Sequence, residues 1–286
     1  IVNAIVNATS GQVKFTLSEA LASARLAYTA VTSVGGEASG TPHNRDLTGA
    51  ELTTVNPSSQ AITVAGLVNG NTYTLTVAGT DLAANAAGTI TRMGIVYDTT
   101  APAFMPVTPL SGVRINAVTR IVQWSNSEAL ASGVITYART GGSADTASHA
   151  FNITGSLLNA GTRNADLGDL INEGIYTLSV SGTDIAGNVG STVSNDSITY
   201  DTQKPNFGSV TPIANADVNE QGAQVTFTLS EKLQDALISY KATTSYNGET
   251  ANNEYTYALT TTEKNNFVGV SQTKSIPGLK DGNTYN

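Results

Sequence analysis

The sequence of 286 residues contains no cysteine, which excludes a disulfide framework and a cysteine-ligated zinc site. Its only histidines are His43 and His149, so a Ser-His-Asp triad could be built only around one of these two residues. The formal net charge of -8 argues against nucleic acid as a partner. No stretch approaches the roughly 20 apolar residues of a membrane helix, so we expect no membrane insertion in this segment. Charged residues (13%) and aromatic residues (6%) are few, but a hydrophobic fraction of 40% is enough for packed cores.

An internal repeat is the strongest pattern in the sequence. Residues 98–102 (Asp-Thr-Thr-Ala-Pro) recur 103 positions later as residues 201–205 (Asp-Thr-Gln-Lys-Pro). Several other landmarks keep their spacing to the residue, which chance does not produce. They are the segments ending in Ser-Glu at 15–19, 124–128 and 227–231, a tyrosine ten positions after each of these serines (Tyr28, Tyr137, Tyr240), and a tyrosine eight positions before an aspartate (Tyr73, Tyr176).

These landmarks predict three domains, which we call repeat 1 (residues 1–98), repeat 2 (99–201) and repeat 3 (202–286). Counting from the landmarks, we expect repeat 1 to lack its first strand, repeat 2 to be complete and repeat 3 to lack its last strands. The chain is therefore expected to be an interior piece of a longer array. The linkers at 99–102 and 202–205 are short and end in proline, which limits bending and favours a semi-rigid rod.

Apolar and polar residues alternate with period two in every repeat. Residues 13–17 (Val-Lys-Phe-Thr-Leu), 176–180 (Tyr-Thr-Leu-Ser-Val) and 225–229 (Val-Thr-Phe-Thr-Leu) are examples. About seven such runs in each repeat predict an all-β fold of tandem immunoglobulin-like β-sandwiches in an extended array. Short helical turns are expected within 47–52 and 157–170. Tyr73, Tyr176 and Tyr285 are expected to form tyrosine corners at the start of the sixth strand.

Residues 176–188 and 201–205 carry the pattern Tyr-x-Leu-x-Val-x-Gly-Thr-Asp-x-Ala-Gly-Asn, followed by Asp-Thr-x-x-Pro. This pattern resembles the bacterial immunoglobulin-like repeats of large cell-surface adhesins. In repeat 1 the pattern departs at one position, because Ala84 replaces the glycine. The resemblance implies an extracellular location, at a bacterial cell surface or secreted, which the cysteine-free composition also suits.

Four residues are predicted to meet where repeat 1 joins repeat 2: Asp98, Glu128, Asp184 and Asn188. Strands of a sandwich alternate in direction, so the ends of the second and sixth strands face the linker that carries Asp98. Neighbouring carboxylates repel one another, and either a raised pKa or a hard cation such as Ca2+ relieves the repulsion. The resemblance to calcium-stiffened adhesin repeats also points to calcium. The alternative is structural: Asp184 and Asn188 bond their own turn, Glu128 is solvated and Asp98 caps the linker.

The remaining candidates are interpreted as packing residues. His43, His149 and Tyr255 occupy one equivalent position in the three repeats, and Trp124 takes the place of Phe15 and Phe227 in a core. We therefore expect no enzyme, but extracellular stalk or adhesin repeats that contact neighbouring repeats of the same chain and carry a host-surface, glycan or protein ligand. Two alternatives stay open. One is a self-assembling surface filament or layer completed by strands of other chains, and the other is a glycan- or protein-binding module beside a secreted enzyme.

Overall fold

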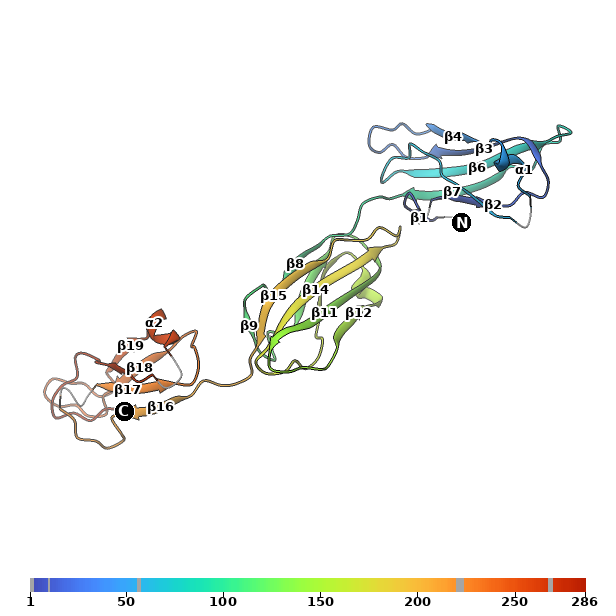
Figure 1. Ribbon diagram of the computed structural model, residues 1–286. Helices are drawn as coiled ribbons and strands as arrows, with labels where there is room; N and C mark the ends of the chain where they lie inside the picture. The colour runs from blue at the N-terminus through green and yellow to red at the C-terminus, as the bar shows by residue number, and fades with distance from the viewer. Residues whose placement is uncertain (1–2, 10, 56–57, 220–223, 267–269) are drawn as a thin grey trace. The chain divides into compact units, whose positions relative to one another are not determined.

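The protein is built mainly from β-strands, which confirms the all-β prediction (Figure 1). The structure is a computed structural model that describes residues 3–9, 11–55, 58–219, 224–266 and 270–286. It separates into two compact units, Ile1–Thr202 and Gln203–Asn286. None of the helices in the described ranges is long and apolar enough to cross a membrane. These helices are single turns, namely α1 (Ala50–Thr53), the 3-10 helix η1 (Gly155–Leu158) and α2 (Thr261–Asn265).

The first part of the larger unit contains a five-stranded sheet and a two-stranded sheet. The five-stranded sheet has the order β1-β7-β6-β3-β4, in which β1 and β7 are parallel and the other pairs are antiparallel. Within the described residues, β2 pairs only with β5. The strands are β1 (Ile5–Val6), β2 (Val13–Phe15), β3 (Leu21–Ala30), β4 (Pro42–Asp46), β5 (Gln60–Ile62), β6 (Thr72–Asp81) and β7 (Ile90–Tyr97).

The second part of this unit repeats the arrangement. Its five-stranded sheet has the order β12-β11-β14-β15-β9, and its second sheet gains a strand, with the order β13-β10-β8. The central pairs share a register, because Tyr28 of β3 faces Leu75 and Tyr137 of β11 faces Leu178. The strands are β8 (Phe104–Thr108), β9 (Arg114–Ile115), β10 (Val122–Asn126), β11 (Leu130–Gly142), β12 (His149–Ile153), β13 (Gly161–Ala165), β14 (Gly174–Asp184) and β15 (Val193–Tyr200).

The smaller unit has two small sheets. One has the order β16-β17-β20 and the other pairs β18 with β19. The strands are β16 (Phe207–Thr211), β17 (Val225–Leu229), β18 (Leu237–Lys241), β19 (Glu254–Ala258) and β20 (Gln272–Lys274). The structure divides the chain into two units after Thr202, and the division into three domains after residues 98 and 201 stays a prediction.

Hydrophobic side chains gather in three separate cores, one for each predicted repeat. Alternation explains how they form, because every second residue of a strand points inward; β14 alternates between buried and half-buried positions along most of its length. Trp124 is fully buried in the core of repeat 2, which confirms that it is a core aromatic. Its indole nitrogen donates a hydrogen bond to Asn126 Oδ1 at 2.9 Å, so the buried N–H is satisfied.

The predicted tyrosine corners are present in all three repeats. The hydroxyl oxygens of Tyr73, Tyr176 and Tyr285 accept hydrogen bonds from backbone N–H groups five residues upstream, at 2.7, 2.9 and 2.8 Å. Tyr73 and Tyr176 are fully buried. Each corner therefore fixes the loop that leads into β6, into β14, or into Tyr285 in repeat 3.

The loop after β6 adopts the same turn as the loop after β14 although its residues differ. Ala84 has φ 65° where its counterpart Gly187 has φ 99°, and both values lie in the left-handed region. A residue with a Cβ loses about 1–2 kcal/mol in this region, whereas glycine does not. We expect Ala84→Gly to raise the free energy of unfolding of repeat 1 by about 1 kcal/mol, as measured by calorimetry.

Ala83→Gly is the matched control, because Ala83 is not among the positive-φ residues. It is expected to bring no gain in stability, since glycine there only adds freedom to the unfolded chain. An equal gain from both substitutions would contradict the assignment of strain to Ala84.

Candidate functional site

Three acidic side chains meet where the chain passes from repeat 1 to repeat 2. Asp98 follows β7, Glu128 lies between β10 and β11, and Asp184 ends β14. One carboxylate oxygen from each lies within 4.8 Å of the others. Asp184 is buried, with 1% of its surface exposed, and the other two are half-buried. We call this set the junction carboxylates; their role as metal ligands stays a prediction.

A serine positions Glu128 beside the linker. The Ser127 backbone N–H donates to the Ala103 carbonyl at 3.0 Å, and the Ala103 N–H donates to Ser127 Oγ at 2.9 Å. Ser230 and Asn206 form the same pair of bonds in repeat 3, at 3.0 and 2.8 Å. The Ser-Glu landmark of the sequence thus has a structural reason, because the serine joins the end of β10 or β17 to the residue that follows the linker.

Asp184 also holds its own turn together. Its Oδ1 accepts hydrogen bonds from the backbone N–H groups of Gly187 at 2.7 Å and Asn188 at 2.8 Å. Asp81 Oδ1 accepts a similar pair of bonds in repeat 1, from the Asn85 N–H as in repeat 2 and from the Ala83 N–H, both at 2.8 Å. Asp184 therefore bonds its own turn, as the structural alternative to a metal site requires. It nevertheless lies close to Asp98 and Glu128.

Asn188 lies beside the junction carboxylates with its amide nitrogen toward them. The Nδ2 group donates to Asp184 Oδ2 at 2.8 Å and to the carbonyl oxygens of Asp98 at 3.0 Å and Thr100 at 3.2 Å. The Asn188 Oδ1 accepts from Asn7 Nδ2 at 3.2 Å. The predicted ligand role for Asn188 requires its oxygen, and this oxygen is directed to Asn7.

In the part of the chain that the structure describes, no basic side chain balances the negative charges of this junction. Burial raises the pKa of the Glu128 carboxyl, and the charges of Asp98 and Asp184 raise it further. Within the described residues, no ion pair involves any of the three. Bringing like charges together in this way costs free energy that a proton or a cation can recover.

The counterpart of Asp98 at the end of repeat 2 has a basic partner. Arg114 Nη1 lies 2.9 Å from Asp201 Oδ2 and 3.3 Å from Glu173 Oε1. Arg114 begins β9 and is paired with the penultimate residue of β15; in repeat 1 the corresponding position is Ile5. The change from isoleucine to arginine therefore gives Asp201 a positive charge that Asp98 does not receive from β1.

The donor set at the first junction suits calcium. Ca2+ binds six to eight oxygen ligands at about 2.3–2.6 Å, so two ligands of one ion lie up to about 5 Å apart. The 4.8 Å limit among the junction carboxylates is compatible with this spacing, and all three groups are hard oxygen donors. Asp98 Oδ1 also accepts the Thr100 N–H at 2.9 Å, which orients this carboxylate on the linker.

A second set of carboxylates lies beneath the tyrosine corners and was not predicted from the sequence. The Tyr176 hydroxyl donates to Asp145 Oδ2 at 2.5 Å, and His149 Nε2 lies 2.8 Å from the same oxygen. Tyr73 donates to Glu37 at 2.6 Å in repeat 1, where His43 is the second partner. In repeat 3 both Tyr255 (2.7 Å) and Tyr285 (2.9 Å) donate to Glu249, as the described structure shows.

These bonds stabilise the charged form of the carboxylate. The hydrogen bond from Tyr176, followed by those from the Ala147 N–H and His149, lowers the pKa of Asp145 to about 2. Burial, and then the bond to Asp145, raises the pKa of Tyr176 to about 12. The Asp145 side chain is only 2% exposed. The cluster therefore consists of a buried anion and donors that satisfy it, which is a structural rather than a reactive arrangement.

The histidines and Tyr255 pack against the corner tyrosines. His43 meets Tyr73, His149 meets Tyr176 and Tyr255 meets Tyr285 in edge-to-face contacts, with ring centroids 5.7, 5.9 and 6.1 Å apart. This agrees with their interpretation as packing positions. The carboxylate beneath each pair is the partner that the sequence pattern did not reveal.

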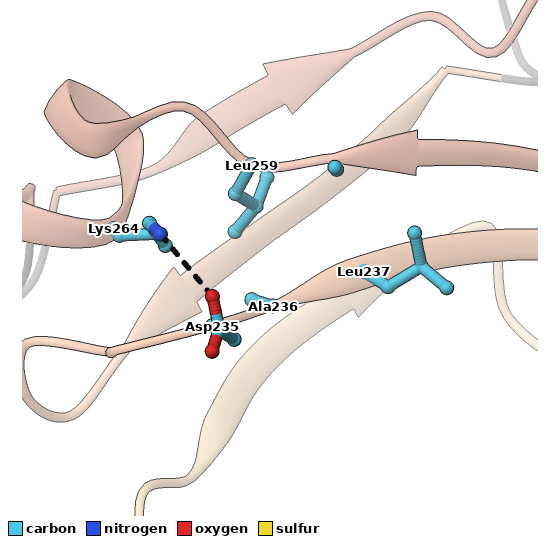
Figure 2. A pocket seen from close by; sticks show the side chains of 6 residues that line it. Asp235, Ala236, Leu237, Leu259 and Lys264 are labelled. Atoms are coloured by element: carbon cyan, nitrogen blue, oxygen red, sulfur yellow. Dashed lines mark ion pairs between the residues drawn. The ribbon is translucent and has the colours of Figure 1, made fainter.

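A hollow in the smaller unit lies between β18 and the segment that leads into α2 (Figure 2). Figure 2 shows Lys264 directed toward Asp235, and their charged atoms lie 3.6 Å apart. The remaining lining residues are apolar: Ala236, Leu237, Ala258 and Leu259. The two charged residues of this lining, Asp235 and Lys264, are paired with each other.

Comparisons with known proteins assign neither a family nor a function to the chain. No protein-family model matches the chain, and no curated protein matches it in sequence. Among solved structures, the FN1-FN3 domains of chicken CNTN1 are 13% identical over 70% of this chain, with a TM-score of 0.31. Dimeric latent PorU from Porphyromonas gingivalis is 13% identical over 99% of it, with a TM-score of 0.25, and an engineered protein is 14% identical over 38%, with a TM-score of 0.25. The chain spans 66%, 31% and 22% of those three chains, and similarity at this level carries no functional information.

Proposed function

We propose that this chain is part of a non-catalytic extracellular stalk or adhesin of a bacterial surface, stiffened by calcium where repeat 1 joins repeat 2. The observation that carries the proposal is the set of junction carboxylates, Asp98, Glu128 and Asp184, within 4.8 Å of one another. They lie at the linker between two repeats, and no ion pair in the described part of the chain balances them. Because Asp98 belongs to the linker side and the other two residues belong to repeat 2, an ion bound by this cluster would restrict the linker between the two repeats.

The wider sequence supports a mechanical role. Repeated domains of one kind add length and little unique chemistry. The histidines pack in cores beside tyrosines, and carboxylates recur at equivalent positions of each repeat. The partners of these repeats are then the neighbouring repeats of the same chain, and a host-surface, glycan or protein ligand is bound by the array.

Calcium would supply the positive charge that the junction lacks. Asp98 would hold it from the linker side, and Glu128 and Asp184 would hold it from the loops of repeat 2. One ion would thereby connect the end of β7 to two loops that follow β10 and β14, which limits the freedom of the linker.

Calcium is expected to stabilise repeat 2, and Glu128→Gln is expected to abolish this effect. Above the dissociation constant, each tenfold rise in calcium concentration adds about 1.4 kcal/mol. The unfolding of the full chain is followed by the fluorescence of its single tryptophan, Trp124, which lies in repeat 2. In chelator the variant is expected to be more stable than the parent near neutral pH. The reason is that the folded-state pKa of Glu128 is raised, so the charged form costs stability at pH values above it.

Glu19→Gln is the matched control, because Glu19 occupies the position of Glu128 in repeat 1. It is expected to leave the calcium response of the Trp124 transition unchanged. Magnesium serves as a second control, because it requires a smaller and more regular site. If calcium fails to move the Trp124 transition of the parent chain at any concentration up to 10 mM or so, calcium binding at this junction is refuted.

A further inference from the structure

Asn188 connects three parts of the larger unit by direct hydrogen bonds. Its Nδ2 donates to the carbonyl oxygens of Asp98 and Thr100, at 3.0 and 3.2 Å, and its Oδ1 accepts from Asn7 at 3.2 Å. Asn7 directly follows β1 of repeat 1, the two carbonyls belong to the linker region, and Asn188 lies in the loop after β14 of repeat 2. We call these three bonds the Asn188 bridge.

The chemistry of the neighbours fixes the orientation of the amide. The two carbonyl oxygens and Asp184 Oδ2, at 2.8 Å, are all acceptors, so only the NH2 end of Asn188 can face them. Its carbonyl end is then directed to the NH2 group of Asn7. Every bond of the bridge pairs a donor with an acceptor, and none of them requires a cation.

The same loop in repeat 1 shows that these contacts are additional to the turn. Asn85 is the counterpart of Asn188, and its Nδ2 donates to Asp81 Oδ2 at 2.7 Å, as Asn188 does to Asp184. In the described structure, no hydrogen bond joins the Asn85 side chain to a linker. In repeat 1 the turn therefore forms without side-chain bonds from the asparagine to a linker. The Asn188 bridge is accordingly a feature of the junction and not of the turn.

The glycine before Asn188 provides a second observation. A Cβ at Gly187 would lie 3.3 Å from Asn7 Nδ2, tighter than an ordinary contact. The counterpart of Gly187 in repeat 1 is Ala84, which carries a Cβ in the same left-handed conformation. The side chain of Asn7 from repeat 1 approaches the loop at Gly187, and the absence of a Cβ there leaves room for it.

We propose that the Asn188 bridge holds repeat 2 in one orientation relative to repeat 1 without a bound cation. The inference goes beyond the calcium proposal, because it assigns Asn188 the role of a hydrogen-bond donor to the linker instead of a ligand. The bridge sets the orientation of the junction, and a cation on the carboxylates would add to its stiffness. Asn188 is in this sense a positioning residue for the junction.

The test measures the distance distribution between the two repeats by double electron–electron resonance on the full chain. Because the protein has no cysteine, Thr91→Cys and Ser194→Cys on the exposed faces of β7 and β15 provide the only labelling sites. In chelator we expect a narrow distribution for the labelled parent and a clearly broadened one for Asn188→Ala. Asn85→Ala, which removes the equivalent bond to the turn, is expected to keep the distribution narrow. The Trp124 unfolding transition of each variant shows that repeat 2 remains folded.

The substitution Asn188→Asp distinguishes a hydrogen-bond donor to the linker from a metal ligand, because aspartate can bind a cation but cannot donate these hydrogen bonds. A carboxylate at this position would face the carbonyls of Asp98 and Thr100 as one more acceptor, so the distribution is expected to broaden in chelator as it does with alanine. If Asn188→Ala or Asn188→Asp stays as narrow as the parent in chelator, the inference is wrong. It is also wrong if the parent becomes narrow only when calcium is added, a result that would support the calcium proposal. Conversely, broadening by alanine together with a Trp124 unfolding transition that calcium does not move would support the bridge and refute calcium binding.

Discussion

Tyr176→Phe is expected to lower the free energy of unfolding of repeat 2 by about 1–3 kcal/mol. The hydroxyl is fully buried, donates to Asp145 at 2.5 Å and accepts the Ile171 N–H at 2.9 Å. Phenylalanine fills the same space but leaves a buried carboxylate oxygen short of one donor and a backbone N–H without its acceptor. Urea unfolding of the full chain, followed by Trp124 fluorescence, measures the loss.

Tyr246→Phe provides the control for this substitution. Tyr246 is 64% exposed and lies in the smaller unit, so removing its hydroxyl is expected to leave the Trp124 transition in place. A Tyr176→Phe chain as stable as the parent would mean that the corner hydroxyl is not needed to satisfy Asp145. In that case the carboxylate cluster beneath the corner would have no part in stabilising the repeat.

Trp124→Ala is expected to have the largest effect on stability, a loss of about 3–5 kcal/mol from repeat 2. Trp124 is fully buried between the two sheets of its repeat, and alanine would leave a cavity that the surrounding strands fill only in part. It would also remove the donor to Asn126 Oδ1. Because the substitution removes the fluorescent probe, differential scanning calorimetry of the full chain is the measurement, and the transition of repeat 2 is expected to move to a clearly lower temperature.

Trp124→Phe is the matched variant, since phenylalanine stands at the equivalent positions 15 and 227. It is expected to cost clearly less than alanine, because most of the ring volume is kept. Asn126 retains its two bonds to the carbonyls of Leu157 and Asn159, both at 3.0 Å, so its side chain stays oriented. Equal losses for the alanine and phenylalanine variants would show that the indole bond to Asn126, instead of core volume, decides the effect.

The junction could be anticipated from the sequence because its residues are tied to strand ends. Asp98 and Glu128 follow strands and Asp184 ends one, each at a constant distance from a landmark, and strand direction alternates in a sandwich. These two facts place the three residues at one end of the sandwich, and the structure shows one carboxylate oxygen of each within 4.8 Å of the others. The orientation of the Asn188 amide could not be anticipated in the same way, since it depends on which end of a short side chain finds acceptors.

The carboxylates beneath the tyrosine corners escaped the repeat analysis for a different reason. Glu37 lies six residues before His43 and Asp145 lies four before His149, so the spacing is not constant, and the acid changes from glutamate to aspartate. These residues sit in loops of different length that follow β3 and β11. Loops of unequal length bring their carboxylates to the same tyrosine only after the sheets have formed.

Whether the aspartate at the end of a repeat receives an arginine partner is also not visible in the repeat pattern. Arg114 pairs with Asp201, whereas Ile5 stands at the equivalent position beside the strand that ends at Asp98. The two positions are 109 residues apart and their repeats differ in loop length, so the periodicity of 103 does not align them. Strand pairing aligns them, because β1 and β9 occupy the same edge of their sheets.

Alternating residues and conserved intervals within the chain are enough to establish the all-β class, the sandwich cores and the tyrosine corners, because these depend on local periodicity and on spacing along single strands. The partners of each charged group depend on loops that meet across the fold, and their contacts are set by three-dimensional distance. Asp98 is therefore left among carboxylates and Asp201 beside an arginine, although the two aspartates occupy the same place in the repeat.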